Sequence, residues 1–416
     1  MTNFELIALI LTATALAGYV NHRFIRLPNA IGLMAASLLL SLSLCVLGKI
    51  GVFDQAQIGL MIQKIDFSNI MMHGMLSFLL FAGAMHVNLA DLRKVRGTVA
   101  LLATGGVVLA VLMTSSLVWL ASSWLGVALP FEYALLFGAL IAPTDPIAVL
   151  GILKDAKVAR RLYMKIGGES LFNDGTGVVI FTMILNMATA QHAPTLFGVA
   201  ALFGREVFGG AALGFMAGWL TTRLIRSAGE YKVEVLLTLA LVTGGYALAE
   251  VLHVSGPIAM VVAGLFVGNH GRARGSADLT HKQLDAFWEM LDEILNAVLF
   301  MLIGMQMILL TMTSDMLLLG VAAIAAVLIG RFVSVTLLVG GMGLWRRRFE
   351  RGTIALLTWG ALRGGISIAM ALSLPSGPGK DLVLDMTYIV VVFSIMVQGT
   401  SFSRVIRWAT RPPPDM

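Results

Sequence analysis

The sequence APTDP, residues 142–146, interrupts an apolar run at residues 131–153 that is long enough to span a membrane. Pro143 and Pro146 break a spanning helix where lipid leaves no water to bond the freed backbone groups. Asp145 between them is ionisable, and such a side chain at bilayer depth costs about 2.5–3.5 kcal/mol on insertion scales, so it marks an ion or proton pathway by default. The stretch therefore predicts a discontinuous helix that lines such a pathway.

The two prolines also remove donors that would have bonded the carbonyls of Ala139 and Ala142. We expect these oxygens to face a cavity, where they help to hold a cation. Thr144 adds a hydroxyl group. Asp145 can counter the positive end of the half-helix that starts there. A simple kink capped by this aspartate explains its presence equally well.

A second polar cluster, GESLFND at residues 168–174, lies in the next apolar run. Ser170 and Asp174 are four residues apart and share a helix face, as do Glu169 and Asn173. At 1.5 Å per residue, Asp174 lies about 18 Å from the inner end of its helix, near mid-membrane. Desolvation there disfavours the charged form, so the carboxyl group can hold either a proton or a small cation. This is the minimum chemistry of proton-coupled exchange.

The composition defines the class of protein. The chain has 416 residues, of which 58% are hydrophobic and 12% charged, so we predict an all-α integral membrane protein with one membrane domain, residues 1–416. Its basic residues do not form a patch, so no nucleic-acid partner is expected. The single cysteine, Cys45, excludes an intrachain disulfide and a cysteine metal site.

Apolar runs predict 13 transmembrane helices. They lie at residues 4–20, 30–48, 68–89, 97–120, 131–153, 162–188, 199–222, 233–251, 255–268, 291–310, 316–341, 352–374 and 383–403.

The basic residues set the predicted orientation. With the N-terminus outside, most of the 29 Lys and Arg residues fall in inside loops, whereas the outside loops hold only Lys49, Lys64 and Lys380. The pattern predicts a multi-pass protein of the cytoplasmic (inner) membrane with its C-terminus in the cytoplasm.

The run at residues 352–374 contains WGALRGG at residues 359–365, a second set of helix-breaking residues. The two interrupted helices are seven helices apart and cross the bilayer in opposite directions. Interrupted helices at matching positions of two halves point to a transporter with inverted repeats. We therefore predict two six-helix inverted repeats, helices 1–6 and 8–13, with two discontinuous helices.

Charged residues near mid-depth also need partners. Glu169 and Arg363 are an opposite-sign pair there, and we predict a structural ion pair between them. Arg331 lies deep in the run at residues 316–341 and is assigned a packing or helix-end role.

Three motifs, in this order and on the predicted helices, resemble those of the monovalent cation/proton antiporters of the NhaP/NHE type: Thr144-Asp145-Pro146, Glu169-Ser170 followed by Asn173-Asp174, and Leu362-Arg363-Gly364-Gly365. The resemblance covers nearly the whole chain. It implies an NhaA-like fold and a homodimer in membrane lipid, with a core mainly at residues 97–190 and 316–408 and a dimerisation part mainly at residues 1–90 and 199–310. It also implies Na⁺ (or Li⁺ or K⁺) exchange for H⁺ by elevator-like alternating access, with no cofactor besides the transported ions.

The resemblance also implies roles for individual residues. Asp174 would be the ion-binding carboxylate, with Thr144 and Ser170 as neutral ligands of Na⁺. Asp145 and Asn173 would balance the half-helix ends, and Glu169 would pair with Arg363. The Asn-Asp pair resembles the electroneutral branch, which fits one Na⁺ for one H⁺.

One position departs from the pattern. Relatives often carry a glutamate in the third helix, about where this chain has Ala82. Water or a backbone carbonyl would then complete the cation site, and the identity of the cation stays open.

Two other classes compete with this interpretation. A sodium-coupled symporter on the same broken-helix plan would need a further polar pocket for an organic solute. An intramembrane aspartyl protease would use two aspartates sharing one proton, but its Gly-x-Gly-Asp motif does not occur here. We therefore expect a transporter and not an enzyme.

Overall fold

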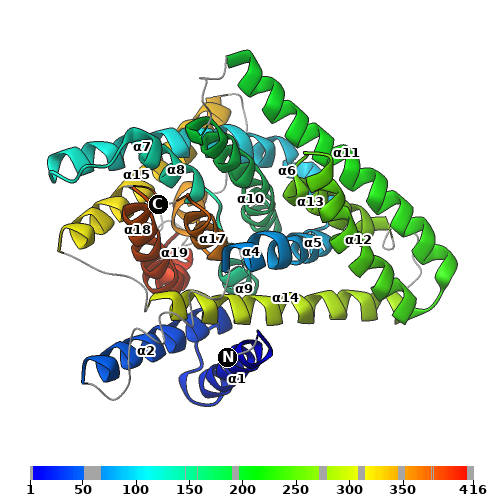
Figure 1. Ribbon diagram of the computed structural model, residues 1–416. Helices are drawn as coiled ribbons and strands as arrows, with labels where there is room; N and C mark the ends of the chain where they lie inside the picture. The colour runs from blue at the N-terminus through cyan, green and yellow to red at the C-terminus, as the bar shows by residue number, and fades with distance from the viewer. Residues whose placement is uncertain are drawn as a thin grey trace, which may run out of the picture.

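Helices are the only regular elements in the residues that the computed structural model describes (Figure 1). These residues are 3–50, 67–145, 147–156, 158–189, 196–270, 279–307, 314–344, 352–375, 377 and 379–409. The predicted all-α class is confirmed. A helix bonds its own backbone groups, so it suits a chain this apolar.

The N-terminal part of the chain folds into helices and short π-helical turns. They are α1 (Asn3–Val20), η1 (Asn21–Ile25), α2 (Asn29–Lys49), α4 (Phe67–Asn69), η2 (Ile70–Met75), α5 (Leu76–His86), α6 (Leu89–Leu101), η3 (Leu102–Gly106), α7 (Val107–Trp124), α8 (Phe131–Leu140), α9 (Ile147–Asp155) and α10 (Arg160–Thr189).

The C-terminal part follows the same plan. Its elements are α11 (Leu196–Ala228), α12 (Tyr231–Val251), α13 (Gly256–His270), α14 (Leu279–Gln306), α15 (Ser314–Leu344), α16 (Thr353–Trp359), α17 (Gly365–Leu372), α18 (Lys380–Phe393), η6 (Ser394–Gly399) and α19 (Thr400–Ala409).

Each predicted apolar segment overlaps one helix or one run of successive helices in the described residues. Six helices there are long and apolar enough to cross a membrane alone, or seven if the bent pair Ile7–Ile25 and Asn29–Leu44 is one span. The broken helices do not meet this criterion because their halves are short: α8 has only 10 residues. The total of thirteen spans therefore stays a prediction.

The helices pack in two groups. In one, α14 runs along one side of the molecule with α1 and α2 beyond it, and it packs against α2 and α5 (Figure 1). The same group includes α11 and α12, which both pack against α13. In the other group, α15 packs against α7, α16 and α18, and α10 packs against α6 and α8. The two groups meet where α10 contacts α13 and where α17 contacts α14.

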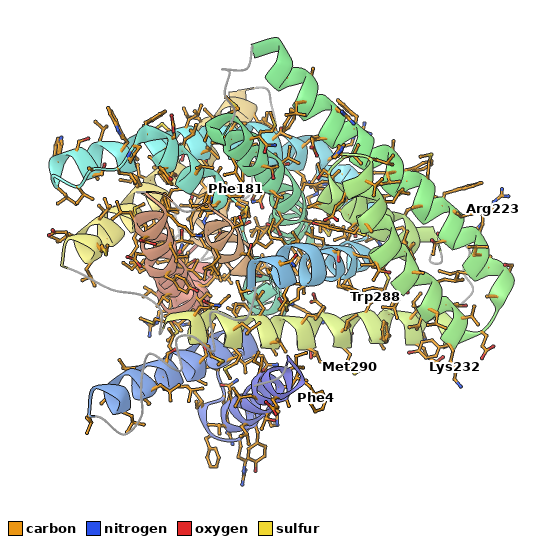
Figure 2. All side chains as sticks on the ribbon, in the orientation of Figure 1. Phe4, Phe181, Arg223, Lys232, Trp288 and Met290 are labelled. Atoms are coloured by element: carbon orange, nitrogen blue, oxygen red, sulfur yellow. The ribbon has the colours of Figure 1, made fainter. Side chains whose placement is uncertain are left out.

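Helix α14 begins twelve residues before the predicted run at residues 291–310. Its first turns carry charged residues, so a prediction from hydropathy missed this part of the helix. Figure 2 shows Trp288 and Met290 on opposite sides of this helix. Trp288 is fully buried, with its ring centroid 4.7 Å from that of Phe81 on α5, whereas Met290 is 58% exposed. A helix buried on one face only is amphipathic and not uniformly apolar.

The two predicted helix interruptions are present, and they touch each other. The chain is non-helical between α8 and α9, and again between α16 and α17. The backbone N–H of Asp145 in the first interruption donates a hydrogen bond of 2.8 Å to the carbonyl of Leu362 in the second. Pro146, part of the predicted break, lies outside the described residues.

Gly177 lets α10 approach the first interruption closely. A Cβ atom at this position would lie 2.6 Å from Cγ of Pro143, well inside van der Waals contact. The missing side chain therefore fixes how near the intact helix lies to the broken one.

We expect Gly177→Ala to destabilise the protein, because overpacking a tight contact costs about 1–3 kcal/mol. The measurement is the thermal midpoint of the purified protein in detergent. Gly340→Ala on α15 is the matched control, since nothing lies within 4 Å of a Cβ atom there. Equal midpoints for the two variants would contradict the close packing.

Candidate ion-binding site

Helix α10 holds the first interruption in place through its polar face. The backbone N–H of Thr144 donates to Oδ1 of Asn173 (3.1 Å) and to Oδ1 of Asp174 (3.2 Å). Both side chains are buried, and Asn173 is fully enclosed. Because Thr144 lies outside any helix, its N–H needs these acceptors.

The side chain of Thr144 joins the same network. Asn173 Nδ2 donates to Thr144 Oγ1 at 2.9 Å, and this hydroxyl donates to Ser170 Oγ at 3.1 Å. Ser170 Oγ in turn donates to the carbonyl of Thr144. The residues predicted as ion ligands, Asp174, Ser170 and Thr144, therefore lie together, with Asn173 beside them. Carboxylate, hydroxyl and unwound carbonyl oxygens suit a small alkali cation.

Each interruption places a charged side chain at an end of the other broken helix. Arg363 Nη1 donates to the carbonyls of Ala142 (2.6 Å) and Pro143 (3.0 Å), just beyond the C-terminus of α8. Asp145 lies beside Gly364, the N-cap of α17, where a Cβ atom would be 2.8 Å from its Oδ2. A cation at a helix C-terminus and an anion at an N-terminus both oppose the helix dipole.

The predicted ion pair between Glu169 and Arg363 is wrong. Glu169 pairs with Arg331 on α15, with Nη1–Oε1 and Nη2–Oε2 distances of 2.7 Å each. Arg331 also donates to the carbonyl of Leu357, near the C-terminus of α16. Arg363 instead donates hydrogen bonds to the carbonyls of Ala142 and Pro143, just beyond the end of α8.

The sequence contained two buried arginines and one candidate acidic partner, so it gave no basis for choosing between them. Helix periodicity explains the outcome. Glu169 lies about 100° around α10 from Ser170, so it points away from the interruption and toward α15. Arg331 is thus a supporting residue that the sequence analysis did not identify as a charge partner.

A cavity of about 400 Å³ reaches this network. Thr144, Asp145 and Asp174 form part of its wall, and Lys154 and Tyr163 also line it. Residues of α5 and α14 form another part of the wall. On α14, acidic and amide side chains form two pairs four residues apart: Glu289 with Glu293, and Asp292 with Asn296. This spacing was visible in the sequence, but most of it fell outside or at the edge of the predicted apolar run.

Ala82 does not line this cavity. It is buried, and its carbonyl lies 2.8 Å from Nδ1 of His86 one turn later. The polar contribution of α5 to the wall is His86, and Gly83 leaves the wall open beside it. On this side of the cavity, the carboxylates come from α14.

Comparisons with known proteins agree with this arrangement. The sequence profile described as "Sodium/hydrogen exchanger, transmembrane" matches residues 10–408. The Na(+)/H(+) antiporter NhaP of Pseudomonas aeruginosa is 48% identical over 411 residues, which cover 97% of this chain and 96% of that protein. The Na(+)/H(+) antiporter NhaH of Halobacillus aidingensis is 36% identical over 298 residues, covering 70% and 72%.

Among solved structures, the sodium proton antiporter MjNhaP1 from Methanocaldococcus jannaschii, at pH 8, superposes with a TM-score of 0.75. The match covers 98% of each chain at 18% sequence identity, so it concerns the fold alone.

A multi-pass helical membrane protein with two crossed, broken helices around a buried carboxylate belongs to the class of membrane transporters. Within that class, this chain is a member of the sodium/hydrogen exchanger family. The relatives named above are antiporters, so the symporter and protease alternatives find no counterpart among them.

The ion pair between Glu169 and Arg331 leads to a prediction about stability. Arg331→Ala should lower the thermal midpoint in detergent strongly, because an unpaired buried charge costs about 3–5 kcal/mol. Adding Glu169→Gln should restore part of the loss, since the uncompensated carboxylate is then gone.

The matched comparison uses the other arginine. Arg363→Ala combined with Glu169→Gln should show additive losses, because Arg363 bonds to carbonyls. If Glu169→Gln rescues Arg363→Ala and not Arg331→Ala, the assignment of the pair is incorrect.

Proposed function

We propose that this protein exchanges Na⁺ for H⁺ across the cytoplasmic membrane, with Asp174 binding the two ions in turn. One observation carries the proposal: the Asp174 carboxylate is buried, borders the cavity and lies among neutral oxygen groups. The naming of its relatives as Na(+)/H(+) antiporters supports the same activity. Li⁺ and K⁺ remain alternative cargoes.

The electrostatics of Asp174 favour exchange. Its one hydrogen bond among the described residues comes from the backbone N–H of Thr144, and it has no ion pair there. A buried carboxylate without a cationic partner is costly. A proton or a small cation removes that cost, and one carboxylate has room for only one of them at a time.

The same geometry supports a stoichiometry of one Na⁺ for one H⁺. The neighbour of Asp174 is Asn173, whose amide group is uncharged and is used by Thr144. In this proposal, Asp174 is the one group at the site that changes its charge during the cycle. We accordingly propose electroneutral exchange.

The two packing groups suggest how access alternates. We propose that the core, mainly residues 97–190 and 316–408, moves as an elevator against a dimerisation part, mainly residues 1–90 and 199–310. The cavity in this structure lies between the first interruption, in the core, and α5 and α14, in the dimerisation part. Such a boundary opens or closes when one group slides past the other.

The proposed topology has the N-terminus outside and the C-terminus in the cytoplasm. Lys154 directly follows the predicted run at residues 131–153, at the end that the charge pattern assigns to the cytoplasm. It borders the cavity, so the cavity would open to the cytoplasm. We also propose a homodimer embedded in lipid. Large apolar side chains exposed on α11 and α12, such as Phe208, Phe215 and Leu236, suit a membrane environment.

Asp174→Asn should abolish exchange while leaving a folded protein, because the amide can neither lose a proton nor neutralise a cation. The measurement is Na⁺-induced dequenching of a pH-sensitive dye in everted vesicles, with size-exclusion chromatography as the test of folding. Asp381→Asn, an exposed aspartate at the start of α18, is the matched control and should keep wild-type exchange. Wild-type dequenching by Asp174→Asn would refute the proposal.

Competition at one carboxylate also predicts a pH dependence. Protons occupy the site at low pH, so the apparent affinity for Na⁺ should weaken as the pH falls. The concentration of Na⁺ for half-maximal rate should rise by up to about tenfold per pH unit, as proton concentration does. Rates in proteoliposomes between pH 6 and pH 8 would test this, and a constant half-maximal concentration would argue against competition.

A further inference from the structure

The part of the cavity wall that α14 forms carries its own polar row. Four residues of α14 border the cavity and form two pairs four residues apart, Glu289 with Glu293 and Asp292 with Asn296. This spacing puts them on one face of the helix. None of the three carboxylates forms an ion pair within the described residues.

Asp292 differs from the two glutamates beside it. Glu289 and Glu293 are exposed, whereas Asp292 is half-buried. Its side chain receives one hydrogen bond in the described part of the chain, from Asn296 Nδ2 to Oδ1 at 3.2 Å. Oδ2 of this half-buried carboxylate therefore has no donor among the residues that the structure describes.

Asn296, one turn later, is only 5% exposed. Its Nδ2 is used twice, by Asp292 Oδ1 and by the carbonyl of Asp292 at 2.8 Å. The side-chain oxygen accepts no hydrogen bond from any described residue. Because Asn296 lines the cavity, this oxygen is available to a ligand there.

A third unsatisfied group reaches the cavity from α17. Ser367 is 1% exposed, and its hydroxyl has no hydrogen-bond partner among the described residues. The first turn of α17 packs against α14: a Cβ atom on Gly365 would lie 2.4 Å from Cδ1 of Leu299. Ser367 and Asn296 therefore approach the same cavity from two helices that touch.

We propose that Asp292, Asn296 and Ser367 form a second binding station, at which a monovalent cation is held on its way between the cytoplasmic solution and Asp174. This inference rests on the function proposed above. The station has the same composition as the Asp174 site, one carboxylate with neutral oxygen groups. Among the described residues, no three His, Cys, Asp or Glu side chains are grouped closely enough to hold a metal ion.

Because of where it lies, the station should affect Na⁺ binding from only one face of the membrane. Asp292 and Asn296 lie on α14, in the proposed stationary part, whereas Asp174 lies on α10, in the proposed moving part. The station can assist the cation only while Asp174 faces this cavity. Loss of the station should therefore weaken Na⁺ binding from the cytoplasmic face and leave the opposite face unchanged.

The test measures initial rates of exchange for Asp292→Asn against Na⁺ concentration, separately for each face of the membrane. In everted vesicles, with Na⁺ at the cytoplasmic face, KM should rise about tenfold, the change that about 1.4 kcal/mol of lost attraction gives. The rate at saturating Na⁺ should stay within about twofold, because Asp174 is intact. In right-side-out proteoliposomes, KM for external Na⁺ should equal that of the wild type.

Matched variants separate the station from general electrostatics. Glu293→Gln removes the same charge one residue away, but from an exposed side chain screened by solvent and salt, so KM should change less than about twofold. Asp292→Glu keeps the charge and should retain most of the wild-type affinity. If Asp292→Asn does not fold, Ser367→Ala should give a smaller one-sided rise in KM.

Three results would overturn the station: an unchanged KM at the cytoplasmic face, an equal rise at both faces, or a loss of maximal rate alone. The same results would leave the function of Asp174 standing, provided that the wild type exchanges and Asp174→Asn does not. If the wild type shows no exchange, the proposed function itself fails.

Discussion

A backbone N–H or C=O group without a partner costs several kcal/mol in a lipid-surrounded interior, and the two broken helices create such groups near the centre of this molecule. The structure meets this constraint by crossing the interruptions. The N–H of Asp145 bonds to the carbonyl of Leu362, and Arg363 bonds to two carbonyls beyond α8. Each interruption supplies partners that the other lacks, so neither would be stable alone.

The two buried arginines also provide hydrogen-bond donors to backbone carbonyls of the broken helices. Arg363 and Arg331 each donate to carbonyls at or near the C-terminus of the first half of a broken helix, and Arg331 is further held by Glu169. A buried charge requires such partners. Because these cations are occupied by carbonyls and by Glu169, neither forms an ion pair with Asp174. The carboxylate at the centre thus depends on an ion from solution for its neutralisation.

Helix α10 both lines the proposed ion site and pairs with Arg331, and its periodicity places these two functions on different faces of the helix. Ser170, Asn173 and Asp174 face the first interruption and hold Thr144, whereas Glu169 faces α15 and holds Arg331. A short sequence therefore carries both the proposed ion site and a fixed structural pair. The cavity reaches the proposed ion site and not the structural ion pair, since Asp174 borders the cavity and Glu169 does not.

The resemblance to a known family implied that Thr144 and Asn173 belong with Asp174 and Ser170. The sequence alone determined the all-helical class, the positions of both helix interruptions and the helix face that Ser170 and Asp174 share. These features depend on local rules: apolar length, proline chemistry and the 3.6-residue helical repeat. Tertiary structure decided which arginine pairs with Glu169, that Arg363 serves the end of α8, and that α14 brings its acidic face to the cavity. Those choices depend on which helix faces come together across long sequence separations, and no local pattern in a single sequence encodes that proximity.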